Sequence, residues 1–168
     1  MKTILFSFWV LLFSVSPLFG QEKISADQTQ TLIDIYLKSF SGEPGYRVSG
    51  MSEEMMKHFN ETGMWKNPNF ARFMKQIKIY KTLHFQSSAE SAQQIVGNAD
   101  AAIKKDNLYK PYAMLKQNGA TSYIYIRTTK NKITEIGYIV INQSGIGASS
   151  FVGDNIDIES IRSIFPDK

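Results

Sequence analysis

The chain has 168 residues, of which 19 are lysine or arginine and 15 are aspartate or glutamate, so its net charge is +4. It contains no cysteine, which excludes disulfides, thiol catalysis and cysteine-zinc sites. The mild excess of positive charge gives no reason to expect a nucleic-acid partner.

The first twenty residues have the layout of a secretory signal peptide. Lys2 precedes an apolar run from Ile4 to Leu18, and Gly20 and Gln21 follow it. This run is shorter than the ~20 residues of a spanning helix. We therefore expect residues 1–20 to be cleaved near Gly20-Gln21, with no transmembrane segment left. The alternatives are a buried core helix and an uncleaved anchor.

The remaining residues, 21–168, have a suitable length for one domain. With no cysteine to acylate near the cleavage point, the product is not expected to be a lipoprotein. We therefore expect a free periplasmic or secreted protein.

Apolar residues at helical spacing predict three helices in the first part of this domain. Leu32, Ile35 and Tyr36 lie on one face of the first helix. Ser52 is a suitable N-cap for the second helix, and Pro68 can begin the third. In chain order we expect a helix over 27–40, a strand over 46–49, a helix with Met55, Met56 and Phe59 inward, and a short helix with Phe70, Phe73 and Met74 inward.

From Ile77 the apolar period changes from helical to alternating. The segment from Ile77 to Phe85 alternates apolar and polar residues, which predicts a half-buried strand. Ser87 and Glu90 form a capping box. The helix that follows has an apolar stripe that ends at Ile103.

The last third predicts a strand meander. Asn118-Gly119 is a type I′ turn signal between strands over 112–116 and 121–128. Two further strands are expected over 133–141 and 146–152, before a closing helix with Ile158, Ile161, Ile164 and Phe165 inward. This order favours an α+β fold, with an antiparallel meander sheet and helices packed mainly on one face.

Four features together carry a family resemblance: the signal, the hairpin at 112–119, the strand over 133–141, and the ending over 152–158. On these features the chain resembles the exported Bacteroidetes family called domain of unknown function 4252, over about residues 23–165. The resemblance implies the periplasm of a Gram-negative cell and transfers no catalytic, cofactor or ligand residue. Through the family's gene neighbourhoods it also implies a link to sigma and anti-sigma regulation.

Two histidines are candidates for chemistry. His58 lies beside Met55 and Met56, a combination that suits Cu(I), but methionines at this spacing are more typical of a helix core. His84 precedes Ser87, yet no Gly-x-Ser-x-Gly elbow is present, and Ser87 is better explained as a helix cap.

The paired carboxylates and glycines also favour structural roles. Glu53 and Glu54 are typical first-turn helix charges. Asp154 and Asp157 lack the closing glutamate of a calcium loop. The segment from Gly145 to Gly147 lacks the lysine of a phosphate loop. We therefore expect no metal and no cofactor.

The strongest binding candidate is a basic segment from Thr62 to Ala89, which contains no acidic residue. Aromatic residues alternate with its cations, so an anionic lipid head group, an acidic glycan or an acidic protein is a suitable ligand. The alternative is a solvated basic face over an aromatic core, with its lysines paired in space with Glu53, Glu54 or Glu61. The candidate patch residues are Lys66, Arg72, Lys75, Lys78, Lys81 and Tyr80.

A second binding candidate is the segment from Gly145 to Gly153, which is rich in glycine and serine. We expect it at a sheet edge, where it can accept a partner strand. Together, these patterns favour a non-catalytic binding or regulatory module that contacts a protein or another component of the cell envelope. The alternatives are a small hydrolase-like enzyme on an unfamiliar scaffold and a lipid or hydrophobic-ligand carrier.

Overall fold

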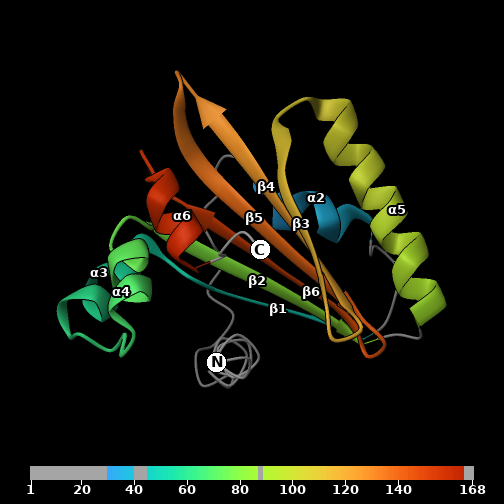
Figure 1. The fold of residues 1–168 in the computed structure, drawn as a ribbon, viewed down its shortest axis with the longest axis horizontal. Helices are drawn as coiled ribbons and strands as arrows, with labels where there is room; N and C mark the ends of the chain where they lie inside the picture. Colours follow the sequence, from blue (N-terminus) through green and yellow to red (C-terminus); the bar gives the residue numbers. More distant parts are fainter. Residues whose placement is uncertain (1–29, 40–44, 87–88, 165–168) are drawn as a thin grey trace.

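The computed structural model describes residues 30–39, 45–86 and 89–164, which form a six-stranded antiparallel sheet beside five helices (Figure 1). The strand order is β1-β2-β6-β5-β4-β3. The prediction of an α+β fold with an antiparallel meander is confirmed, because β3 to β6 are neighbours in chain order. The strands are β1 (Tyr46–Met51), β2 (Ile79–Gln86), β3 (Tyr109–Gln117), β4 (Ala120–Thr129), β5 (Lys132–Asn142) and β6 (Gly145–Val152).

The sequence predicted helices mainly on one face of the sheet. In the structure they lie on both faces. α2 (Leu32–Ser39) and α5 (Ala89–Asp106) belong to one hydrophobic cluster. α3 (Glu53–Glu61), α4 (Pro68–Met74) and α6 (Ile158–Ile164) belong to a second cluster on the opposite face. In Figure 1 these three short helices gather at one end of the sheet, and α5 lies at the other.

The α2 face is packed with aliphatic and aromatic side chains. Leu32 and Ile33 of α2 are fully buried, as is Leu83 of β2. Gly137 of β5 makes room for α2, because a Cβ there would collide with the Leu32 side chain. The helix can therefore approach the sheet closely only over a glycine.

The opposite face is packed with aromatic rings. Phe73 of α4 is fully buried, and its ring lies 5.1 Å from that of Phe151 on β6. The Tyr80 ring of β2 also contacts Phe151, with 5.0 Å between the two ring centroids. Phe151 therefore joins α4 to the centre of the sheet.

The local signals for helix starts and turns are confirmed. The Ser52 side chain accepts a hydrogen bond from the Met55 N–H at 3.4 Å, and Pro68 opens α4. Asn118 and Gly119 both have positive φ, as a type I′ turn requires. These features depend on neighbouring residues only, so the chain specifies them locally.

Two strand predictions are wrong. β2 is not half-buried, because Tyr80 and Thr82 are buried on one face while Leu83 and Phe85 are buried on the other. β6 is not an edge strand, because it pairs with β2 on one side and β5 on the other. A Cβ at Gly145 would collide with the Phe85 carbonyl, so small residues on β6 serve close packing rather than protection of an edge.

Several predictions lie outside the described residues. They are the signal peptide over 1–20, the start of the first helix over 27–29, the caps at Ser87 and Ser88, and Phe165. Within the part of the chain that the structure describes, no helix combines the length and the apolar character needed to cross a bilayer.

Candidate functional site

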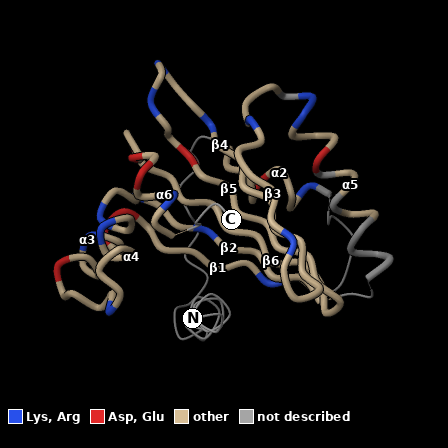
Figure 2. The backbone as a smooth tube through the Cα atoms, viewed as in Figure 1, with Lys and Arg blue, Asp and Glu red and all other residues tan. Residues whose placement is uncertain are grey.

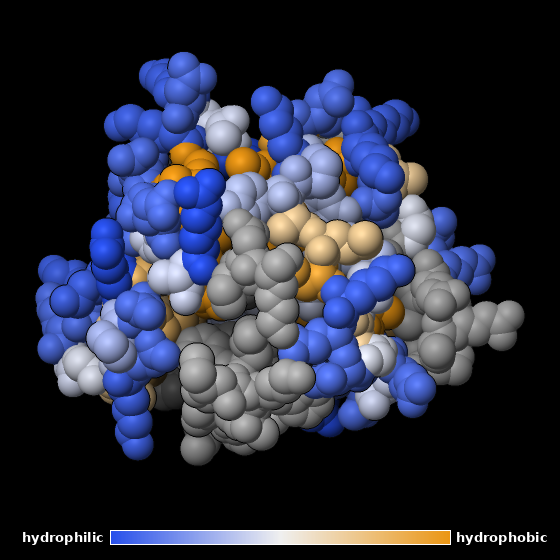
Figure 3. All heavy atoms as spheres, viewed as in Figure 1, coloured by the Kyte–Doolittle hydropathy of each residue, from blue (hydrophilic) through white to orange (hydrophobic). Residues whose placement is uncertain are grey.

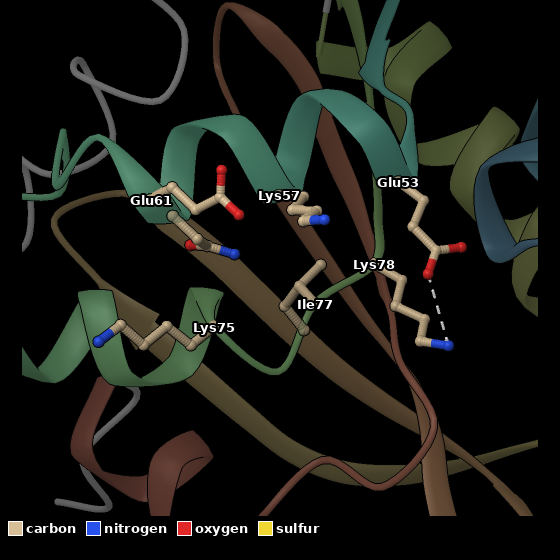
Figure 4. A pocket seen from close by; sticks show the side chains of 7 residues that line it. Glu53, Lys57, Glu61, Lys75, Ile77 and Lys78 are labelled. Atoms are coloured by element: carbon tan, nitrogen blue, oxygen red, sulfur yellow. Dashed lines mark ion pairs between the residues drawn. The ribbon is translucent and has the colours of Figure 1, made fainter.

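A shallow, open groove of about 410 Å³ lies between α3, the end of α4 and the start of β2. We call it the α3–α4 groove. Figure 4 shows Glu53, Lys57 and Glu61 of α3 on the side facing Ile77 and Lys78. At this end of the molecule the surface is mainly hydrophilic (Figure 3). The groove is lined by Glu53, Lys57, Asn60, Glu61, Lys75, Ile77 and Lys78.

Helix periodicity places the α3 residues in the groove. Glu53, Lys57 and Glu61 are spaced four apart, so they lie along one face of a helix. Met56 of the same helix is buried in the second hydrophobic cluster and holds α3 against the core. The polar side chains of α3 are therefore held above the groove.

Asn60 joins the two helices at the base of the groove. Its amide nitrogen donates a hydrogen bond to the Met74 carbonyl at the end of α4, at 3.1 Å. Its amide oxygen accepts one from the Trp65 indole at 2.9 Å. Because one side chain contacts both α4 and the connecting segment, the distance between α3 and α4 is fixed.

Charges are compensated at one end of the groove. The Lys78 ammonium lies 2.7 Å from Asp154 and 3.6 Å from Glu53, and its hydrogen bond to Asp154 raises the pKa of Lys78 above its ordinary value. Among the described residues, Lys57 and Lys75 have no ion-pair partner within 4.0 Å. In Figure 2, acidic and basic segments of the chain lie interspersed around α3 and α4. Two ammonium groups of the groove, those of Lys57 and Lys75, are therefore outside ion pairs, beside the carboxylates of Glu53 and Glu61 that line the same groove.

The structure divides the basic patch predicted from the sequence. Lys75 and Lys78 line the groove, while Lys66 and Arg72 are exposed nearby, with Arg72 3.4 Å from Asp157. Tyr80 is buried in the aromatic core. Whether the exposed members bind a partner stays a prediction.

Lys81, the remaining patch residue, lies on the opposite face of the sheet. Its side chain is buried and its ammonium contacts Asp34 of α2 at 3.0 Å. Adjacent strand residues point to opposite faces, so Lys81 and Tyr80 cannot serve one surface. The structure thus leaves Lys81 with a partner inside the fold.

The sequence predicted Glu53, Glu54 or Glu61 as spatial partners of the lysines in the basic segment, and the structure confirms one such pair, Glu53 with Lys78 at 3.6 Å. Lys57 was not predicted as part of a site. The signal for it was its spacing of four from Glu53 and Glu61, which predicts a shared helix face.

A second group of charged residues, the α2 anchor, is buried between α2 and the sheet. Glu135 of β5 is fully buried, and its carboxylate contacts the Arg127 guanidinium at 3.0 Å. It also accepts hydrogen bonds from the Tyr109 hydroxyl at 2.7 Å and the Leu32 N–H at 2.8 Å. Burial and the neighbouring Glu135 raise the pKa of Tyr109. The α2 anchor comprises Glu135, Arg127, Tyr109, Lys81 and Asp34.

The chemistry of the α2 anchor is structural. The N–H groups at the start of a helix lack intrahelical partners, and here Glu135 accepts from Leu32 while the Ser150 hydroxyl accepts from Ile33 at 3.3 Å. The Arg127 guanidinium donates to the Gln30 carbonyl at 2.8 Å. Every one of these contacts ties the first turn of α2 to the sheet.

We predict that acid weakens the α2 anchor through Asp34. Burial raises the pKa of Asp34, but hydrogen bonds from Thr31 and Lys81 outweigh it and hold the pKa below its ordinary value of 3.8. A lowered folded-state pKa contributes stability above about pH 3.8 that is lost as the pH falls toward the folded value. Asp34→Asn should therefore unfold more readily than the natural chain at pH 7, with a smaller difference at pH 3. Urea titrations at both pH values measure this, and an equal difference at both would contradict it.

The histidine candidates lie on different elements. His58 is exposed on α3, and its ring contacts Phe59. His84 is half-buried on β2, where burial and the nearby Arg47 lower its pKa. Within the described residues, no group of three or more histidine, cysteine, aspartate and glutamate side chains has the arrangement of a metal site.

Comparison with known proteins yields one match. A family model described as domain of unknown function DUF4252 matches residues 40–164. No curated protein and no solved structure matches the chain significantly. The match covers both sides of the α3–α4 groove, whereas α2 precedes it.

Proposed function

The chain belongs to the DUF4252 family of domains of unknown function, and we propose that it is a non-catalytic module that binds an acidic segment of a partner protein in the α3–α4 groove. As part of the proposal, the module works in the cell envelope after export. The N-terminal sequence from Lys2 to Gln21 supports that location.

The uncompensated charge of the groove is the observation that carries this proposal. Lys78 has two carboxylate neighbours, whereas Lys57 and Lys75 have none within 4.0 Å among the residues that the structure describes. Complementary charge accelerates and orients association with an acidic partner. Two exposed ammonium groups on opposite walls of one groove therefore favour a ligand with carboxylates along its length.

The lining of the groove favours a peptide over a lipid. Sites for hydrophobic ligands are lined mainly by apolar and aromatic side chains. Here Ile77 is the only aliphatic residue among seven lining residues, which otherwise carry charges or an amide. A volume of about 410 Å³ accommodates a few side chains of an extended segment.

The test reverses the two uncompensated charges. The full 168-residue sequence is expressed, and the protein is used to capture partners from envelope extracts. Lys57→Glu combined with Lys75→Glu should weaken capture about fivefold, since two lost charge contacts together are worth on the order of 1 kcal/mol. Lys78 and Lys81 stay unchanged because they already have carboxylate partners.

The matched control is Lys116→Glu, which reverses an exposed lysine on β3, away from the groove. This control should capture the same partner as the natural chain, and a synthetic glutamate-rich peptide should compete with that partner in low salt. If nothing is captured, or if both variants behave alike, the groove is not the binding site.

A further inference from the structure

Two turns of the meander consist of two residues each, and both contain an asparagine. Asn118 and Gly119 join β3 to β4, and Lys130 and Asn131 join β4 to β5. All four residues have positive φ, as type I′ turns require. The asparagine is the first central residue of the β3–β4 turn but the second of the β4–β5 turn. The residue that follows each asparagine therefore lies in a different environment.

Gly119, which follows Asn118, lies within the turn itself. It is exposed, and a Cβ at this position would meet nothing within 4 Å. Among the hydrogen bonds of the described residues, none uses the Gly119 N–H or the Asn118 side chain. Lys132, which follows Asn131, is instead paired with Thr129 in the β4–β5 ladder. The backbone nitrogen after Asn118 is thus accessible, whereas the one after Asn131 lies in the sheet.

We propose that Asn118 is a site of spontaneous deamidation. The Gly119 nitrogen loses its proton to solvent and attacks the side-chain amide carbon of Asn118, so that a new C–N bond closes a cyclic imide. The bond from that carbon to the side-chain nitrogen breaks, and the nitrogen takes a proton from solvent and leaves as ammonia. Water then opens the imide at either of its carbonyl groups, which yields aspartate or isoaspartate. Water is the only co-reactant.

The dipeptide and the turn both favour this reaction at Asn118. Asn118 is the only asparagine in the chain that precedes a glycine, and glycine has no side chain to block the approach of the amide carbon. The type I′ conformation does not itself hold the two reacting atoms in contact, so the turn must open briefly. Such opening is easy at an exposed loop tip, because loop tips are among the least stable parts of a folded protein.

The two products differ in their effect on the hairpin. Aspartate fits the same turn, because Asp-Gly also favours type I′, and it adds a negative charge. Isoaspartate lengthens the main chain by one carbon, which should displace the Gln117–Ala120 pair beside the turn. Because β3 is an edge strand, its turn end can separate from β4 while the centre of the sheet stays paired.

The reaction does not depend on the proposed function. In Figure 1 the turn between β3 and β4 lies at the end of the sheet opposite to α3 and α4. Deamidation should therefore leave the α3–α4 groove unchanged, and a failure of either proposal leaves the other standing.

Prolonged incubation in mildly alkaline buffer, followed by peptide mapping with mass spectrometry, tests the proposal on protein produced from the full-length sequence. The peptide that contains Asn118 should change from amide to carboxylate and should separate into two products, one of which matches the Asn118→Asp variant. The peptide that contains Asn131, from the same digest, should keep its amide. If Asn118 also keeps its amide throughout the incubation, the proposal is wrong.

Lys132→Gly separates the effect of the turn from that of the dipeptide. This variant has Asn-Gly at both turns, but the nitrogen after Asn131 still lies in the β4–β5 ladder. In the folded variant, Asn131 should react about fivefold more slowly than Asn118, because its neighbouring nitrogen must first give up a hydrogen bond. In concentrated urea, where neither turn persists, the two rates should be similar. Similar rates in the folded variant, or a difference that persists in urea, would overturn the role assigned to the turn.

Discussion

Glu135→Ala is expected to lower the free energy of unfolding by about 3–5 kcal/mol. The Glu135 carboxylate is fully buried and has three partners, the Arg127 guanidinium, the Tyr109 hydroxyl and the Leu32 N–H. Removing it leaves a buried cation without its counter-charge and two donors without an acceptor. Since domains of this size are stable by only about 5–15 kcal/mol, the variant should be close to unfolding.

Thermal denaturation followed by circular dichroism measures this effect. We expect the midpoint to fall by roughly 6–20 °C, at about 2–4 °C for each kcal/mol in a chain of this size. Glu159→Ala is the matched control, because it also removes a glutamate paired with an arginine, at 2.6 Å, but on the surface. The control should leave the midpoint almost unchanged.

Glu135→Gln separates the charge from the shape of the side chain. Glutamine keeps an acceptor oxygen for the Leu32 N–H but removes the negative charge beside Arg127. An intermediate loss of stability is therefore expected. If Glu135→Ala and Glu159→Ala had similar midpoints, the α2 anchor would contribute little to stability.

Phe73→Ala should destabilise the protein by about 3–5 kcal/mol, the usual cost of removing a large aromatic side chain from a core. Phe73 is fully buried, and its ring contacts those of Phe151 and Phe70 at centroid distances of 5.1 and 6.3 Å. The contact with Phe151 holds α4 against β6. Its loss should therefore also loosen the α4 side of the α3–α4 groove.

Urea unfolding at neutral pH measures the Phe73→Ala effect, with Met64→Ala as the control. Met64 is 58% exposed, so its truncation should change stability by no more than about 0.5 kcal/mol. Phe73→Leu should lie between the two, because leucine fills part of the same space. Equal stability of Phe73→Ala and the natural chain would show that α4 does not rest on this ring.

The elements that were predicted correctly have signals in adjacent residues. Ser52 and Pro68 mark the starts of α3 and α4, and Asn118-Gly119 marks a hairpin. Each signal works through the backbone of its own turn, so no knowledge of distant contacts is needed. The chain order of strands and helices then indicated the fold class.

The central place of β6 in the sheet, between β2 and β5, has no such signal in adjacent residues. Its glycines and serines are typical of an unprotected edge, yet here they allow close approach of β2, as the collision of a Cβ at Gly145 with the Phe85 carbonyl shows. The burial of Lys81 was equally hard to predict. A lysine on a strand is normally exposed, and this one is buried because the carboxylate of Asp34, distant in the chain, pairs with it. Both outcomes depend on residues far away in the chain.

The candidate site was predicted in part for the same reason. Lys75 and Lys78 belong to the basic segment seen in the sequence, and both line the α3–α4 groove. The acidic wall supplied by Glu53 and Glu61 comes from a different segment, and its position depends on how α3 packs. The sequence named Glu53 among the spatial partners of these lysines, as the contact with Lys78 confirms, but it did not place Lys57 or Ile77 in the groove.

The strand that is synthesised last lies in the middle of the sheet. β2 and β5 both pair with β6, and the N–H groups of Leu32 and Ile33 are bound by side chains 103 and 117 positions later in the chain. During synthesis, none of these contacts can form until most of the polypeptide has left the ribosome, because such distant contacts form late. The topology thus delays completion of the sheet until β6 is available to join β2 to β5.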